Sequence, residues 1–200
     1  MKKIIVSVLL IGMMLSQSVF AAESSRFSDV PSNASYAEAV NTLADMGILN
    51  GDKAGRFNPD KTITRAEAAV IICKIAGVAD EAAKIKKSSF SDVPSNYWAV
   101  GYIAKANELG IISGYSKTKF GPKDTVTYEQ FIKMLVCTRG YGEDAKEKGG
   151  FPNGYLAVAE DRGIVSDDVV KNSALRGNIA VLVYNAINSP SSYEKGGDIS

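Results

Sequence analysis

Apolar residues recur at helical spacing in two pairs of segments, and the first segment of each pair stops at a glycine. The first-segment stripes are Val40, Leu43, Ala44 and Met46, then Ile103, Ala106 and Leu109. Gly47 and Gly110 follow them, at the position where a left-handed glycine commonly ends a helix. The second-segment stripes are Ala68, Ala69, Ile72 and Ala76, then Phe131, Met134 and Leu135. The pattern predicts two pairs of amphipathic helices.

The second helix of each pair has a clear start signal. Thr64-Arg65-Ala66-Glu67 and Thr127-Tyr128-Glu129-Gln130 both have the form of a capping box. In that motif the threonine hydroxyl accepts from the backbone N–H three residues on, and the Glu or Gln side chain accepts from the threonine N–H. Turn signals, Asn58-Pro59-Asp60 and Gly121-Pro122-Lys123, precede these starts.

The two helix pairs belong to an internal repeat. Phe27-Ser28-Asp29-Val30-Pro31-Ser32-Asn33 recurs at residues 90–96, an offset of 63, and 15 of the 52 positions from 27 to 78 are identical without a gap. A weaker third copy, 151–188, aligns Gly163-Ile164-Val165 with residues 110–112 and places Arg176 at the position of Arg65. One helix pair cannot bury its apolar stripe alone, so we expect the copies to pack together.

Several regions lie outside the copies. Lys2 and Lys3 precede an uncharged run from Ile4 to Phe20, which predicts a secretory signal peptide over residues 1–21. The connections 79–89 and 142–150 are polar and are interpreted as spacers, and residues 189–200 as a flexible tail. No other stretch is long and apolar enough to span a membrane, so no membrane association is expected after signal cleavage.

Composition excludes several functions. The chain has 23 Lys+Arg and 22 Asp+Glu, a formal charge of +1, which argues against a nucleic-acid binder that works through bulk charge. It has no histidine, which removes histidine bases and His-ligated zinc, and its two cysteines are too few for a Cys-only zinc site. We expect no metal and no cofactor, and we expect Cys73 and Cys137 to be buried free thiols rather than a disulfide.

These motifs resemble the S-layer homology family. The resemblance rests on Phe-Ser-Asp-Val-Pro, Gly47-Ile48-Leu49-Asn50-Gly51, Phe57-Asn58-Pro59, Ile63-Thr64-Arg65-Ala66-Glu67 and Tyr97-Trp98-Ala99. It implies a mainly α fold in which three helix-loop-helix repeats, 27–78, 90–141 and a degenerate 151–188, pack as a pseudo-threefold prism. It also implies a secreted protein of the bacterial cell wall or S-layer, bound non-covalently to secondary cell-wall polysaccharide, often pyruvylated, in grooves between repeats.

Arg65 is the leading candidate for binding that polymer. A cation at the first position of a helix is unfavourable by roughly 0.3–1 kcal/mol, whereas free backbone N–H groups there attract anions. A guanidinium beside them would complete a site for a carboxylate such as a pyruvyl ketal. The alternative is a solvated arginine or an ion pair with Asp29 or Asp60. Arg176 is the candidate in the third copy, although Leu175 before it provides no standard cap.

The remaining candidates each have a structural alternative. Tyr128 replaces the arginine in the second copy, and Glu67 is also explained by its capping box. Trp98 could pack against a sugar ring or belong to the core. Asp29 and Asp92 could cap the first helices at local turns or brace the neighbouring arginines, and Gly51 and Gly114 could permit unusual backbone conformations or close ligand approach.

A non-enzymatic role is expected, because the repeated acids are explained by caps and turns and no carboxylate pair is set apart for glycan hydrolysis. A calcium loop starting at Asp52 fails, since Ala54, Arg56 and Phe57 occupy ligand and glycine positions. The alternative function is a protein–protein interaction or assembly module at the cell surface, whose partner would be another surface protein and not a glycan.

Overall fold

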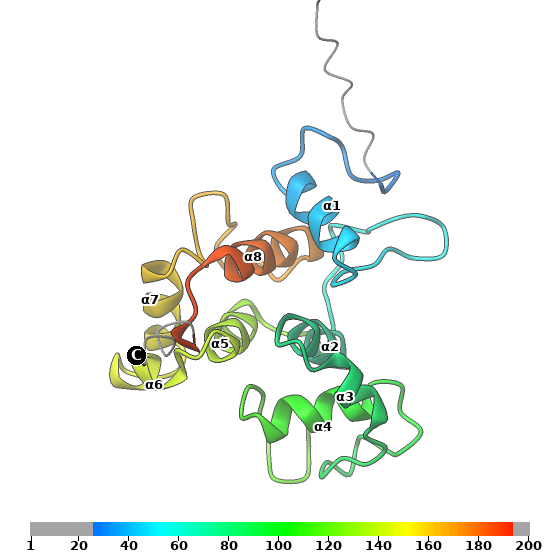
Figure 1. Ribbon diagram of the computed structural model, residues 1–200, viewed down its shortest axis with the longest axis vertical. Helices are drawn as coiled ribbons and strands as arrows, with labels where there is room; N and C mark the ends of the chain where they lie inside the picture. Colours follow the sequence, from blue (N-terminus) through cyan, green and yellow to red (C-terminus); the bar gives the residue numbers. More distant parts are fainter. Residues whose placement is uncertain (1–25, 194–200) are drawn as a thin grey trace, which may run out of the picture.

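The computed structural model describes residues 26–193, so the predicted signal peptide and residues 194–200 of the predicted tail lie outside the described residues. Within that range the chain is mainly helical (Figure 1), which confirms the predicted class. The helices are α1 (Ala37–Asp45), α2 (Arg65–Ile75), α3 (Ala79–Lys84), α4 (Val100–Glu108), α5 (Tyr128–Thr138), α6 (Gly142–Glu147), α7 (Asn153–Asp161) and α8 (Arg176–Asn188). None of these helices is long and apolar enough to cross a membrane.

The helix boundaries follow the local sequence signals. Capping boxes begin α2 at Thr64 and α5 at Thr127, as predicted, and α8 begins after Leu175 without a side-chain cap. Gly47 and Gly110 follow α1 and α4 with φ of +69°, a backbone conformation that favours glycine.

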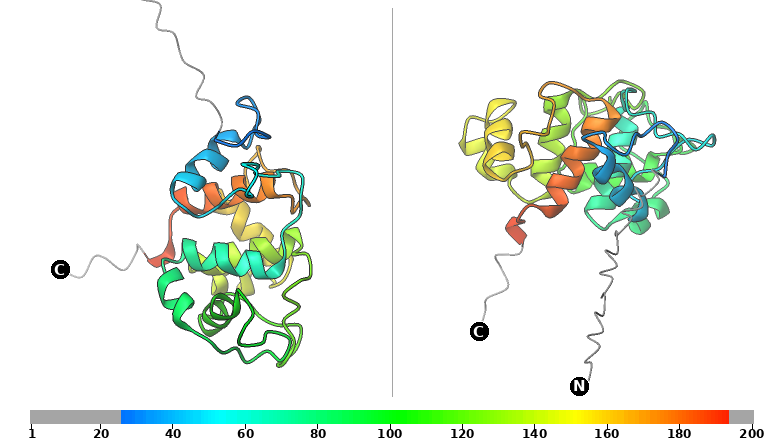
Figure 2. Two further views of the ribbon diagram at one scale, coloured as in Figure 1. Left: turned by 90° about the vertical axis from the view of Figure 1, so that its right-hand side faces the viewer. Right: turned by 90° about the horizontal axis from the view of Figure 1, so that it is seen from above.

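The first helix of each copy packs on the second helix of another copy and not on that of its own copy. Helix α4 packs on α2, α7 on α5, and α1 on α8, although α1 and α8 lie at opposite ends of the described sequence. Figures 1 and 2 show α2, α5 and α8 inside the assembly, with α1, α4 and α7 outside them. This cyclic pairing is compatible with three repeats, while the regular pseudo-threefold prism stays a prediction.

The opening Phe-Ser-Asp-Val-Pro motif closes the loop of its own repeat. The rings of Phe27 and Phe57 lie 5.5 Å apart, and those of Phe90 and Phe120 lie 5.4 Å apart, both pairs tilted. All four side chains are buried in the common core. The repeated phenylalanines therefore tie the start of each repeat to its later loop, across about 30 residues of chain.

The predicted spacers are only partly correct. Residues 79–89 and 142–150 contain the short helices α3 and α6, which pack on α4 and α7. Glycine permits this approach: a Cβ at Gly101 would lie 1.9 Å from the carbonyl oxygen of Ala82, and a Cβ at Gly154 would lie 2.0 Å from that of Ala145. The connections are folded parts of the repeat, and their six-residue helices are too short to show a periodic signal.

The first residues of the predicted tail also pack on the fold. Arg139 Nη2 donates to the Ser189 carbonyl at 2.6 Å, and the Tyr141 hydroxyl donates to the Pro190 carbonyl at 3.2 Å. Ser189 and Ser191 are buried. Residues 189–193 thus cover the end of α5 and are not a loose extension.

We expect Gly101→Ala and Gly154→Ala to destabilise the protein, because the added methyl group must displace a backbone carbonyl. Overpacking of this kind costs about 1–3 kcal/mol, measurable as a lower urea midpoint. Gly142→Ala is the matched control, since its Cβ would meet nothing closer than Cys137 Sγ at 3.4 Å. Equal stability of Gly101→Ala and wild type would contradict the packing described for α3.

Candidate functional site

The N-terminus of α2 docks on the loop of the second repeat. The backbone N–H of Arg65 donates to the Asp124 carbonyl at 2.9 Å, and that of Ala66 donates to the Pro122 carbonyl at 3.1 Å. The expectation that free N–H groups here would bind an anion is therefore wrong, because protein carbonyls already occupy them. The helix end serves as a joint between two repeats.

The Arg65 side chain extends the same joint. Its Nε donates to the Phe120 carbonyl at 2.9 Å, Nη2 to the Ser113 carbonyl at 2.8 Å, and Nη1 to Gln130 Oε1 at 3.3 Å. The guanidinium carbon lies 4.6 Å from the Tyr115 ring centroid and 4.5 Å from that of Phe120. Burial lowers the pKa of Arg65 through desolvation, but a guanidinium starts so high that it stays charged.

Arg176 repeats this arrangement at the junction between the third copy and the first. Its backbone N–H donates to the Lys61 carbonyl at 2.8 Å. Its Nε donates to the Phe57 carbonyl at 2.9 Å, and its Nη2 to the Asn50 carbonyl at 3.0 Å. The guanidinium carbon lies 4.6 Å from the Phe57 ring centroid. The alignment of Arg176 with Arg65 thus corresponds to a shared geometry, each arginine contacting the loop of another repeat.

Tyr128, at the start of α5, has different surroundings from Glu67 and Gln130, the third residues of α2 and α5. Tyr128 is buried at the start of α5, and burial is the main cause that raises its pKa. Glu67 Oε2 accepts from the Thr64 N–H and hydroxyl, so its capping role is confirmed. Gln130 Oε1 accepts from the Thr127 N–H and also from Arg65.

Asp29 and Asp92 hold the loops on which the arginines rest. Asp29 accepts from the backbone N–H groups of Phe57 and Asn58, both at 2.7 Å. Asp92 accepts from those of Phe120 and Gly121 at 2.9 and 2.8 Å. The carboxylates act on the loop backbone and do not cap α1 or α4, neither of which has a side-chain cap, so the predicted capping of the first helices is wrong. They position the carbonyls that receive the guanidinium groups.

Gly51 and Gly114 are required by packing. A Cβ at Gly51 would lie 2.4 Å from Phe27 Cε1, and a Cβ at Gly114 would lie 2.4 Å from the Lys119 carbonyl oxygen. Neither glycine has a left-handed φ, so the expected need for an unusual backbone conformation is wrong. Gly114 nonetheless lines a pocket, and because glycine has no side chain it takes up little of the pocket's space.

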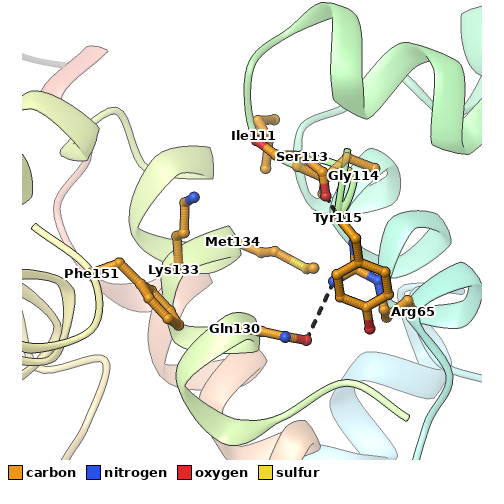
Figure 3. Close-up of a pocket in the computed structure, with 10 residues that line it drawn as sticks. Arg65, Ile111, Ser113, Gly114, Tyr115, Gln130, Lys133, Met134 and Phe151 are labelled. Atoms are coloured by element: carbon orange, nitrogen blue, oxygen red, sulfur yellow. Dashed lines mark hydrogen bonds between the residues drawn. The ribbon is translucent and has the colours of Figure 1, made fainter. Parts of the chain in front are cut away.

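The pocket beside Arg65 is built from four separate segments of the chain and is called the Arg65 pocket below. It has a volume of about 170 Å³ and is lined by Arg65, residues 111–115, Gln130, Lys133, Met134 and Phe151. Figure 3 shows Arg65 and Tyr115 on one side, with Lys133 and Phe151 on the other. The lining contains two cations and no acid, so its field favours an anionic ligand.

A second pocket, the Arg176 pocket, has a different charge. It has a volume of about 310 Å³ and is lined by Asn50, Gly51, Asp52, Phe57, Asn58, Lys61, Thr62, Glu67 and Arg176. Two acids here balance two bases. Hydrogen bonds to Asp52, first from Asn58 and then from the Arg56 backbone, hold its pKa below the usual range, so this carboxylate is ionised at neutral pH.

The aromatic contribution comes from residues that the sequence interpretation missed. Trp98 is 59% exposed and lies 6.0 Å from the Tyr97 ring, but it lines neither arginine pocket. Tyr115 and Phe151 are exposed and do line the Arg65 pocket. Lys133 was also missed, although the offset of 63 pairs it with Val70 and so marks a cation on an otherwise apolar helix face.

No group of three or more metal-ligating side chains lies close enough to hold a metal ion in residues 26–193. Cys73 and Cys137 are free cysteines, Cys73 buried and Cys137 half-buried. Burial raises the pKa of the Cys73 thiol to about 11. This thiol is therefore protonated and unreactive at neutral pH.

Comparison with known proteins finds two copies of one domain in this chain, separated by the same offset of 63 residues. The pattern of the S-layer homology domain matches residues 26–69 and 89–132. The chain is a member of the S-layer homology family. The matched segments are the first two repeats, each taken through the first turn of α2 or α5. The third copy is not among them and stays a prediction.

Similar proteins come from bacterial surfaces. A cell surface protein of Thermoanaerobacter kivui is 34% identical over 195 residues, which cover 95% of this chain and 25% of that protein. A middle cell wall protein of Brevibacillus brevis is 32% identical over 193 residues, which cover 94% of this chain and 18% of that protein. A surface-layer 125 kDa protein of Lysinibacillus sphaericus is 33% identical over 175 residues, which cover 83% of this chain and 14% of that protein.

The chain thus spans a quarter or less of the length of these S-layer homology relatives. All three are cell-surface, cell-wall or surface-layer proteins, which confirms the predicted location in the bacterial cell wall or S-layer and supports anchoring at the cell surface in general.

We expect Asp92→Asn to lower the free energy of unfolding by about 1–3 kcal/mol at pH 7, because an amide cannot accept both loop N–H groups as a carboxylate does. Desolvation raises the pKa of Asp92, but the N–H groups of Phe120 and Gly121 lower it more, to a net value below 3.8. Its stabilisation is therefore present above pH 3.8 and is lost as the pH falls through the folded pKa. Urea titrations from pH 7 to pH 2.5 should show the difference between wild type and variant shrinking with acid; a constant difference would contradict this role.

Proposed function

We propose that the chain anchors to the cell wall by binding secondary cell-wall polysaccharide, with an acidic group of the polymer, such as a pyruvyl ketal, in the Arg65 pocket. The observation that carries the proposal is the lining of this pocket. Arg65 and Lys133 face it from different repeats, and no acidic side chain lines it. A carboxylate can accept charge-assisted hydrogen bonds from both cations.

Arg65 contributes as a fixed donor. Its three hydrogen bonds to protein use three of the five guanidinium N–H groups and hold the plane in place. Arg65 is 3% exposed, so a ligand can contact only the edge of its guanidinium group and not the rest of the side chain. A cation that is already ordered loses little side-chain entropy when a ligand binds.

Lys133 contributes the accessible charge. It is half-buried, and its Nζ lies 5.8 Å from the Phe151 ring centroid and 5.7 Å from that of Tyr155. No acid lines the Arg65 pocket, and Glu143, which lines the adjoining hollow together with Lys133, is paired with Lys146. Lys133 therefore offers its ammonium hydrogens to a ligand without first breaking an ion pair.

The exposed rings of Tyr115 and Phe151 complete the site for a sugar. Pyranose rings have apolar faces of C–H groups, and these pack on aromatic rings. Tyr115 is 56% exposed and Phe151 is 52% exposed, so both rings have area to offer. The proposed role is non-catalytic, since binding and retention need no reacting group here.

The Arg176 pocket supports a weaker or different contact. Glu67 and Asp52 lie in it with Arg176 and Lys61, so an acidic sugar would meet repulsion as well as attraction. We propose that the Arg65 pocket takes the charged part of the polymer, and that the Arg176 pocket accepts only uncharged sugars.

We expect Lys133→Ala to weaken binding to purified wall sacculi roughly tenfold, because a hydrogen bond to a charged group is worth about 1.5–3 kcal/mol. Lys133→Glu should weaken it further by repelling the polymer. Co-sedimentation of purified protein with sacculi from the source organism measures both, with polymer-stripped sacculi in parallel.

Lys87→Glu is the control, because it makes the same charge change at an exposed position that lines neither arginine pocket. Arg65→Ala is a poor test, since it also breaks the joint between repeats. Equal sedimentation with intact and stripped walls would overturn the glycan proposal and favour a protein partner.

A further inference from the structure

A second hollow adjoins the Arg65 pocket, and it is called the α5 pocket below. It has a volume of about 440 Å³, and Ser113 and Lys133 line both. Cys137, Lys146 and Tyr155 are among the residues that line it farther along α5 and α6. Its size lies within the range of roughly 300–1,000 Å³ typical of ligand sites. The two hollows therefore make one longer groove along α5.

One residue position explains the extra room in the second repeat. The tenth residues of α2, α5 and α8 are Lys74, Cys137 and Asn185. Lys74 Nζ donates to the Gly47 carbonyl at 2.6 Å and to the Ile48 carbonyl at 3.2 Å. The ammonium group thus fills the space between its helix and the Gly-Ile turn of the first repeat.

The third copy fills the same space with a different side chain. Asn185 Nδ2 donates to the Ile164 carbonyl at 3.4 Å and to the Ser166 hydroxyl at 2.8 Å. In the second repeat the side chain of Cys137 ends at Sγ, three atoms short of a lysine. Gly110, from the corresponding turn, lines the α5 pocket together with Cys137. The short side chain of Cys137 therefore leaves open the space between helix and turn that Lys74 and Asn185 fill in the other two copies.

We propose that the α5 pocket is a second subsite for the wall polysaccharide, so that successive sugar residues of one polymer strand occupy the Arg65 pocket and the α5 pocket. This inference rests on the proposed function and adds that the site binds more than one successive sugar residue of the polymer. Lys133 lies where the two subsites meet, and the Lys146 ammonium offers a polar contact in the second, where Tyr155 is buried against Cys137. Lys146 is paired with Glu143 at 2.6 Å, so the far end is less basic than the Arg65 end and suits the uncharged part of a repeating unit.

Cys137→Lys tests this subsite with a residue that the chain already uses at the equivalent position. The new ammonium should reach the Gly110 and Ile111 carbonyls as Lys74 reaches Gly47 and Ile48, and fill the α5 pocket. Cys137→Ser leaves the pocket open and is the matched control. Thermal unfolding establishes that both variants fold. Lys146→Glu, at an exposed position, is a second variant that does not alter buried packing.

The probe is acid-released wall polysaccharide from the source organism, fractionated into single repeating units and longer chains, with affinity measured by calorimetry. For wild type and Cys137→Ser we expect longer chains to bind roughly tenfold more tightly than single units, a gain of about 1.4 kcal/mol. Cys137→Lys should lose this gain and keep its affinity for single units. Lys146→Glu should reduce the gain.

The outcomes separate the two proposals. If Cys137→Lys binds long chains as tightly as wild type while Lys133→Ala loses binding, the second subsite is wrong and the proposed function stands. If long chains and single units bind wild type equally after correction for the number of units, the second subsite is also wrong. If no fraction binds wild type, the proposed function and the subsite fall together.

Discussion

The docking of a helix N-terminus onto the loop of another repeat is the interaction on which the rest of this structure depends. At α2 and again at α8, the first two backbone N–H groups donate to loop carbonyls, and an arginine adds two more such bonds while lying over a phenylalanine ring. These N–H groups have no partner within their own helix, so the loop must supply one. Neither repeat can satisfy its polar groups alone.

This joint places the residues of the Arg65 pocket under unequal constraint. Arg65, Asp92 and Gly114 hold the helix end, the loop and the Phe90 ring together, so changing any of them alters the fold before it alters a ligand contact. Lys133 lies outside this joint and provides the accessible charge of the Arg65 pocket, whereas the exposed ring of Tyr115 lies 4.6 Å from the Arg65 guanidinium carbon. A residue placed as Lys133 is can change the preferred ligand while the scaffold stays intact.

Sequence reasoning succeeded where the determining interaction is local. The capping boxes at Thr64 and Thr127 and the stops at Gly47 and Gly110 depend on neighbours within a few residues, and all were predictable. The repeat of 63 residues also gave the helices of the first two copies, although each first helix packs on the second helix of another copy.

It failed where two copies must be placed against each other. The N–H groups of Arg65 and Ala66 looked free because their acceptors lie near residue 123. Tyr115 and Phe151 line the Arg65 pocket and were not candidates, whereas Trp98, a candidate for sugar packing or for the core, is exposed and lies outside it, since which ring reaches a groove depends on how α4 packs. The structural need for Gly51 arises from Phe27, 24 positions earlier. Comparing copies position by position would have found Lys133, whose partner in the first repeat is Val70.

The third copy shows what the joint requires when its motif is lost. Asn178 takes the helix position of Glu67 and Gln130, but it turns to its own loop, accepting from the Val170 N–H at 2.8 Å and donating to the Val170 and Ser173 carbonyls. One buried amide thus holds a loop that lacks the Phe-x-Pro sequence. At the facing junction Tyr128 replaces the arginine and is buried. This copy supplies Arg176 to the first repeat and Phe151 to the second, so it completes both arginine pockets while its own junction carries no guanidinium. The predicted third copy therefore closes the ring of contacts, because its α8 packs on α1 of the first repeat.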